Sequence, residues 1–233
     1  ELARNHADEG SVGQHYALWM EEQGLANWRD YFRPPGGNHA PRKWHWDLPE
    51  RYHQNRWIAE RTTERLAHHQ RTGEPFFLWA SFFDPHPPYL APPPWDTLYA
   101  NAPLTIPHGR PGEHARNPPH FGLTQQPNPD FSAWQEPGGN VVHGFHSHLV
   151  TPEVRRHCVE LYYGMITMMD TYIGRILDQL DALDLADSTL VVFTSDHGHL
   201  FGQHDLTDKG PFHYEDLLRV PFLASQPGTL PAG

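Results

Sequence analysis

The sequence contains a single cysteine among 233 residues, Cys158, so it cannot hold an intrachain disulfide framework. It also lacks a long hydrophobic run: its longest, Phe76–Phe83, is far short of the roughly 20 apolar residues that span a membrane. Nor is positive charge in excess, since the formal net charge is −11. We therefore expect no membrane span and no nucleic-acid partner. These features fit a periplasmic, extracellular or cytoplasmic location alike.

The stretch from Thr189 to Lys209 contains the main candidate site residues. Its apolar start, Leu190–Phe193, is β-branched and aromatic, which predicts a buried strand. Asp196 and His197 follow, and ligands of open α/β sheets bind at the carboxyl ends of strands. A carboxylate and a neutral imidazole are suitable ligands for a divalent cation. Lys209 follows a glycine-containing loop, where its ammonium can hold an anionic oxygen.

An acid and a glycine after a strand are also ordinary turn residues, so this stretch needs support from elsewhere in the chain. Three blocks together resemble the sulfatase family of the alkaline-phosphatase-like superfamily. They are Pro75–Leu78 with Asp84–Tyr89; Tyr162–Gly164 through Asp170 to Leu177; and Ser195–Gly198, Gly202–His204, Lys209–Phe212, Tyr214–Asp216 and Arg219–Phe222. The resemblance implies an α/β fold, an alkaline-phosphatase-like sandwich whose central sheet is mostly parallel and flanked by helices, here incomplete.

The resemblance implies roles for five residues. Asp196 and His197 would bind a divalent metal, usually Ca²⁺, together with acids from an N-terminal strand. Many sulfatases have Asn in place of His197, and an imidazole ligand makes Mn²⁺ or Zn²⁺ more plausible. Lys209 would contact a sulfate oxygen, and His86, flanked by prolines, would bind sulfate and donate a proton to the leaving group. His204 matches a family position near the site, where it either binds substrate or makes a structural hydrogen bond.

Several parts of the sulfatase pattern are missing. Sulfatases convert the Cys or Ser of a Cys/Ser-x-Pro/Ala-x-Arg segment into formylglycine, and this sequence has no such segment. Cys158 lies on a predicted helical stripe, which favours buried packing over nucleophilic work. The family's N-terminal metal-binding acids and Lys/His pair are absent too, the chain does not begin with Met, and it stops at Gly233, before the family's C-terminal subdomain. We therefore expect a middle segment of a sulfatase, with formylglycine in the missing N-terminal part and no activity in this chain alone.

The sequence predicts one partial domain over residues 1–233, in three parts. Residues 74–90 hold a central strand and the His86 motif, 91–150 form a proline-rich excursion, and 151–233 hold a helix, the metal and lysine motif and a following strand. The excursion is expected to be ordered, with a disordered linker as the alternative. Its predicted aromatic anchors are Trp95, Tyr99, Phe121, Phe131 and Trp134.

Helical spacing and following glycines predict helices over Ser11–Glu22 and Asn55–Gln70. Thr151–Glu153 combines a capping hydroxyl, a proline and an acid, which predicts the start of a long helix. Phe76–Phe83 is hydrophobic on both faces, as expected of a central strand. A last strand is expected over Val220–Ala224.

The predicted function is metal-dependent hydrolysis of a sulfate ester carried by a small molecule or a glycan. The close alternative is a phosphonate monoester or phosphodiester hydrolase of the same superfamily, because the Asp-His form of the metal motif also occurs there. An alternative from another class is a non-catalytic binding domain with the same fold. An intact nucleophile segment upstream would favour an enzyme over the binding domain.

Overall fold

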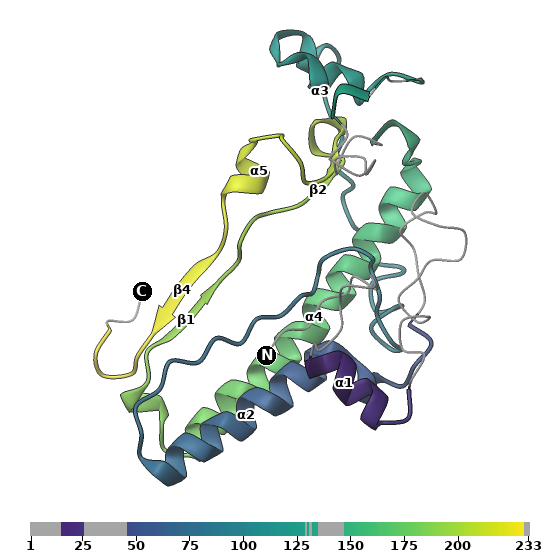
Figure 1. Ribbon diagram of the computed structural model, residues 1–233. Coiled ribbons are helices and arrows are strands. Elements are labelled where there is room, and N and C mark those ends of the chain that lie inside the picture. Colours follow the sequence, from purple (N-terminus) through teal and green to yellow (C-terminus); the bar gives the residue numbers. More distant parts are fainter. Residues whose placement is uncertain (1–14, 26–45, 129, 131, 135–146, 231–233) are drawn as a thin grey trace. The chain divides into compact units, whose positions relative to one another are not determined.

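The computed structural model describes residues 15–25, 46–128, 130, 132–134 and 147–230. The chain forms two compact units. We call them the helical unit, within residues 1–102, 160–190 and 226–233, and the strand unit, within residues 103–159 and 191–225. Figure 1 shows the elements of both. None of the helices within the described residues is long and apolar enough to cross a membrane.

The helical unit is built on two long helices. Its elements are α1 (His15–Glu22), the 3₁₀ helix η2 (Glu50–Tyr52), α2 (Gln54–Thr72), the larger part of α4 (Pro152–Ala182) and the 3₁₀ helix η6 (Ala186–Ser188). Tyr16 and Met20 of α1 share a buried core with Trp57 of α2. Ala59 of α2 packs with Met168 and Tyr172 of α4, and Figure 1 shows these two helices side by side.

The helix boundaries follow the local signals in the sequence. At the start of α2, Nδ1 of His53 accepts a hydrogen bond from the backbone N–H of Asn55 (3.2 Å). Gly73 ends α2 in the left-handed conformation, with φ 68°. At the start of α4, the Thr151 hydroxyl accepts from the backbone N–H of Val154 (3.3 Å). The predicted helices are confirmed, except that residues 11–14 lie outside the described residues.

The strand unit contains short elements. They are the 3₁₀ helices η3 (Glu113–Arg116), η4 (Ser132–Trp134), η5 (Ser147–Leu149) and η7 (Gln203–Asp205); the helices α3 (Pro119–Leu123) and α5 (Glu215–Leu218); the first turns of α4; and the strands β1 (Val191–Thr194), β2 (Leu200–Phe201), β3 (Thr207–Asp208) and β4 (Phe222–Ser225). β1 pairs antiparallel with β4, and β2 with β3. Phe121, Leu200, Leu206, Phe212 and Leu217 form the core of this unit.

The sheet differs from the sequence expectations within the described residues. No strand forms over Phe76–Phe83, where Phe77 is 87% exposed. β1 is not buried, since Val192 is 48% exposed. The described strands form antiparallel pairs, where a mostly parallel sheet was expected. An apolar run becomes a buried strand only when neighbouring strands take up its backbone hydrogen bonds and other elements cover its faces. In the described residues, β1 has only β4 beside it.

Three of the predicted aromatic anchors hold the proline-rich excursion in place. In the helical unit, the Trp95 indole N–H donates to Oε2 of Glu50 (2.9 Å), and the hydroxyls of Tyr99 and Thr167 lie 2.9 Å apart. In the strand unit, Phe121 is buried. These contacts agree with an ordered excursion at the three residues, and order of the excursion as a whole stays a prediction. Phe131 and the Trp134 side chain lie outside the described parts of the chain.

Candidate functional site

Asp196 and His197 follow β1 after one residue, Ser195, at the carboxyl end of the strand. Oδ1 of Asp196 accepts a hydrogen bond from the backbone N–H of His197 (2.8 Å). The other carboxylate oxygen lies 3.5 Å from Nε2 of His197. The Asp196 side chain is 84% exposed and that of His197 is 34% exposed. An oxygen donor and a nitrogen donor therefore lie together at an accessible position.

Lys209 folds back onto His197, with Nζ 3.0 Å from Nε2. Because an ammonium group only donates hydrogen bonds, Nε2 is the acceptor of this contact. The ring proton then lies on Nδ1, which donates to the carbonyl oxygen of Gly198 (2.7 Å). Burial lowers the pKa of Lys209, and the negative charge of Asp196 opposes this shift. The structure thus brings together three of the five predicted site residues.

The donor atoms of Asp196 and His197 fit a shared divalent cation. Two donors 3.5 Å apart can both reach one ion at metal–ligand distances of roughly 2.0–2.5 Å. The neutral ring with an Nε2 lone pair is the form that binds metal, and a backbone acceptor at Nδ1 commonly holds such a ring. Within the described residues, no group of three or more His, Cys, Asp or Glu side chains could hold a metal. A complete ligand set therefore needs further donors.

Close packing at Gly198 sets the turn after His197. The Gly198 N–H donates to the carbonyl oxygen of Leu217 in α5 (2.9 Å). A Cβ at Gly198 would lie 1.8 Å from the carbonyl oxygen of Asp216, so only glycine fits here. From this turn, β2, η7 and β3 form a hairpin over residues 200–208, which we call the Lys209 hairpin because it leads directly into that lysine.

His86 lies in the helical unit, and the backbone of its own turn orients its ring. Its backbone N–H donates to the carbonyl oxygen of Phe83 (3.2 Å). Nδ1 lies 2.5 Å from the carbonyl oxygen of Pro87, which can only accept, so Nδ1 carries the proton. The ring also packs on Phe83, with centroids 4.6 Å apart. The convergence of His86 with Asp196 and Lys209, which belong to the strand unit, remains a prediction.

Asp84 anchors the His86 turn to the first turn of α2. Its Oδ1 accepts from Nε2 of Gln54 (2.7 Å) and its Oδ2 from Nδ2 of Asn55 (2.8 Å). Burial raises the pKa of Asp84 to about 7, against the effect of these two hydrogen bonds. His53 is buried nearby, and burial lowers its pKa to about 4. The sequence assigned no site role to Asp84, although its place two residues before His86 was a signal.

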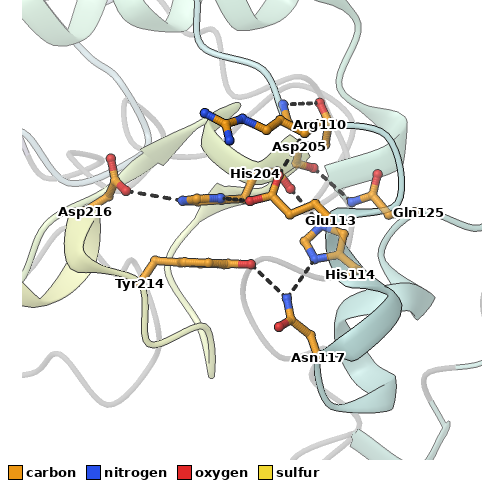
Figure 2. Close-up of polar contacts among 10 residues, drawn as sticks. Arg110, Glu113, His114, Asn117, Gln125, His204, Asp205, Tyr214 and Asp216 are labelled. Carbon is orange, nitrogen blue, oxygen red and sulfur yellow. Dashed lines mark hydrogen bonds and ion pairs between the residues drawn. The ribbon is translucent and has the colours of Figure 1, made fainter.

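His204 lies between two carboxylates in the strand unit (Figure 2). Its Nδ1 contacts Oε1 of Glu113, and its Nε2 lies 3.4 Å from Oδ2 of Asp216. The ring stacks on Tyr214, with centroids 3.6 Å apart and planes within 6°. Substrate binding by His204 stays a prediction, but its structural hydrogen bonding is clear. No pattern in the sequence pointed to Glu113, whereas Asp216 belongs to one of the sulfatase-like blocks.

Comparison with known proteins agrees with the sequence resemblance. A family model described as Sulfatase matches residues 4–232. The chain is 27% identical, over 91% of its length, to a multifunctional alkaline phosphatase superfamily protein from Trinickia caryophylli. It is 29% identical, over 81% of its length, to an arylsulfatase from Clostridium perfringens. It covers 41% and 35% of these relatives, so it spans about two fifths of their length.

A solved structure supports the fold. The phosphonate monoester hydrolase of Agrobacterium radiobacter matches 92% of this chain with a TM-score of 0.67 and 26% sequence identity. The match covers 42% of that chain. The mixed helices and strands described above therefore have the fold of the corresponding part of that hydrolase.

Proposed function

We propose that this chain, which belongs to the sulfatase family, contributes to the active site of a metal-dependent sulfuric ester hydrolase. The observation that carries the proposal is the cluster of Asp196, His197 and Lys209. Oδ2 of Asp196 lies 3.5 Å and Nζ of Lys209 lies 3.0 Å from Nε2 of His197, so two donors suited to a metal and one cation suited to an anion meet at one imidazole ring. A sulfate ester needs both, because negative charge develops on its sulfuryl and leaving oxygens.

Asp196 and His197 are the proposed metal ligands, completed by donors from outside the described cluster. The bound cation would polarise the sulfuryl oxygens. Ca²⁺ is our first expectation because it is usual in the family, while the imidazole nitrogen also suits Mn²⁺ or Zn²⁺. The nucleophile is expected to be a formylglycine that lies outside this chain.

Lys209 is the proposed anion holder. Its ammonium is half-buried, and electrostatic attraction is stronger where water is partly excluded. Burial lowers its pKa, but Asp196 nearby favours the charged form. The contact of Lys209 with His197 supports this role, because the ammonium then lies beside the proposed metal ligands, where a sulfuryl oxygen would bind.

His86 is the proposed proton donor to the leaving oxygen and a sulfate-binding residue. Because Nδ1 donates to the Pro87 carbonyl, proton exchange with a substrate would use Nε2. The anchor at Asp84 supports this role, because buried hydrogen bonds to Gln54 and Asn55 fix the backbone two residues before His86.

The finer fold is part of the proposal: an alkaline-phosphatase-like sandwich with a mostly parallel central sheet. The exposure of apolar side chains in Phe76–Phe83 and β1, such as Phe77 and Val192, supports it. Strands buried on both faces of a parallel sheet have such continuous apolar runs. We therefore propose that both segments are central strands in the complete sheet.

Phosphonate monoester hydrolysis is the second candidate, favoured by the likeness to the hydrolase from Agrobacterium radiobacter. Both reactions need a metal and a cation around a tetrahedral anionic centre, so the Lys209 cluster serves either one. The test is kinetics of the full-length protein on matched aryl sulfates and aryl phosphonates that share one leaving group. A higher kcat/KM for the sulfate supports the sulfatase; a higher value for the phosphonate replaces it with the second candidate.

A further inference from the structure

We propose that Glu113 and Asp216 clamp His204 and thereby fix the Lys209 hairpin, so that these three residues position the lysine. The inference rests on the role proposed above for Lys209 and extends it by naming what sets the place of that side chain. The clamp joins three segments of the strand unit: η3 of the proline-rich excursion, the tip of the hairpin and α5 (Figure 2).

The ring of His204 is held on three sides. Each ring nitrogen faces a carboxylate oxygen, from Glu113 at Nδ1 and from Asp216 at Nε2. A carboxylate only accepts hydrogen bonds, so both contacts are satisfied when both nitrogens carry a proton. The Tyr214 ring covers one face of the imidazole. The hydrogen bond to His204 lowers the pKa of Glu113, which favours its charged form.

The backbone of the hairpin tip needs this support. His204 and Asp205 have φ values of 58° and 53°, in the left-handed region that residues other than glycine rarely adopt. Nε2 of His114 donates to the His204 carbonyl oxygen (2.8 Å). The backbone N–H of Gly109 donates to Oδ1 of Asp205 (2.9 Å). The excursion therefore binds the backbone carbonyl of His204 and the side chain of Asp205, in addition to the His204 ring.

A second set of hydrogen bonds orients the supporting groups. Because His114 donates through Nε2, its Nδ1 is an acceptor, and Nδ2 of Asn117 lies 3.2 Å from it. The same Asn117 amide donates to the Tyr214 hydroxyl (2.8 Å). The Asn117 side chain therefore links Tyr214, which stacks on the His204 ring, to His114, which donates to the His204 carbonyl.

The clamp acts on Lys209 because α5 holds both ends of the hairpin. At its base, the Gly198 N–H donates to the Leu217 carbonyl; at its tip, Asp216 meets His204. Between them, β2 and β3 pair through only two residue pairs, which is little to fix a hairpin. Release of the tip should therefore let Lys209, which directly follows β3, move away from His197.

Hydrogen exchange in the full-length protein tests the clamp without reference to activity. The backbone amides of Gly202, Asp205 and Leu206 are hydrogen-bonded within the hairpin. Glu113→Gln and Asp216→Asn should each speed their exchange by about tenfold or more, since local opening becomes easier. The control is Glu215→Gln. Glu215 lies in the same helix as Asp216, and its exposed carboxylate pairs with Arg219 and not with His204. Exchange in Glu113→Gln equal to that in Glu215→Gln would overturn the clamp.

A double-mutant cycle then tests whether the clamp works through Lys209. Glu113→Gln alone should lower kcat/KM for an aryl sulfate by about tenfold, the usual scale of coupling within a contact network. In a Lys209→Ala background, the same substitution should have almost no further effect. Equal losses in both backgrounds would show a general structural role and overturn the inference.

The two failures can be told apart. If Lys209→Ala leaves the kinetics unaltered, both the proposed role of Lys209 and the positioning inference fall, even where the exchange data support the clamp. If Lys209→Ala is impaired but Glu113→Gln is not, the proposed function stands and the positioning inference alone is wrong.

Discussion

Nζ of Lys209 lies 3.0 Å from Nε2 of His197, although the two residues are twelve positions apart in the sequence. The lone pair of Nε2 cannot serve the ammonium and a metal ion at the same time. A bound metal ion and the ammonium of Lys209 would therefore compete for Nε2 of His197. This relationship makes their roles separable by experiment.

Asp196→Ala and Lys209→Ala should affect the full-length enzyme differently. Asp196→Ala removes a charged ligand, so metal affinity should fall and activity should recover partly at high metal concentration. Lys209→Ala should leave metal affinity unchanged or tighter, but lower kcat/KM by about 10²–10³, as for a lost oxyanion donor. Metal titration and steady-state kinetics on both variants measure this. Weaker metal binding in Lys209→Ala would contradict the separation of roles.

His86→Ala should slow substrates with poor leaving groups more than those with good ones, because only a poor leaving group needs a proton in the transition state. Loss of a general acid typically costs about 10²–10⁴ in rate for such substrates. The measurement is kcat/KM over a series of aryl sulfates with leaving groups of different pKa. His68→Ala, at an exposed position on α2, is the control. An equal loss across the series would limit His86 to sulfate binding.

The isolated 233-residue chain should not turn over aryl sulfates with any added divalent metal. The groups that it supplies stabilise an anion, but without the nucleophile only residual catalysis is expected. Purified chain assayed with Ca²⁺, Mn²⁺ and Zn²⁺ tests this expectation. Robust metal-dependent turnover would mean that the nucleophile lies within this sequence.

Asp84 and His53 should have opposite effects on stability between about pH 4 and 7. The folded pKa of Asp84 is raised to about 7, so the stability that its protonated carboxyl contributes is lost as the pH rises through this window. The folded pKa of His53 is lowered to about 4, so the stability that its neutral ring contributes is lost as the pH falls from about 6.5. Asp84→Asn leaves only the second effect, and its Tm should therefore rise with pH more steeply than that of the wild type.

Thermal unfolding from pH 4 to 8 measures this difference. Glu64→Gln, which removes an exposed carboxylate from α2, is the control and should follow the wild-type curve. Parallel curves for Asp84→Asn and the wild type would show that Asp84 titrates normally in the folded protein.

Two glycines of α4 provide a matched pair. A Cβ at Gly164 would lie 2.1 Å from the carbonyl oxygen of Trp95, so Gly164→Ala forces the backbone apart and should destabilise by about 1–3 kcal/mol. A Cβ at Gly174 meets nothing within 4 Å, so Gly174→Ala should stabilise by about 0.5–1 kcal/mol. Denaturant unfolding of both variants tests the packing, and a stabilised Gly164→Ala protein would contradict it.

Local sequence was enough to predict the helices. The cap at Thr151, the stop at Gly73 and the periodic apolar stripe of α4 act over a few residues, so they can be read without knowing the rest of the fold. The motif of Asp196, His197 and Lys209 was also predicted from the sequence, since its residues are close along the chain. Its functional meaning came from the sulfatase resemblance.

Tertiary structure decided what depends on distant partners. The sequence predicted strands at Phe76–Phe83 and Leu190–Phe193, but a strand also requires neighbours, and β1 obtains only β4 in the described residues. The buried Asp84 accepts its hydrogen bonds from Gln54 and Asn55, about thirty positions earlier. Glu113 meets His204 across 91 positions, and no local pattern in a proline-rich excursion records such a contact. The sequence determined which side chains could bind a metal, hold an anion or donate a proton, because residue type decides these abilities. The fold alone decided which of these side chains meet.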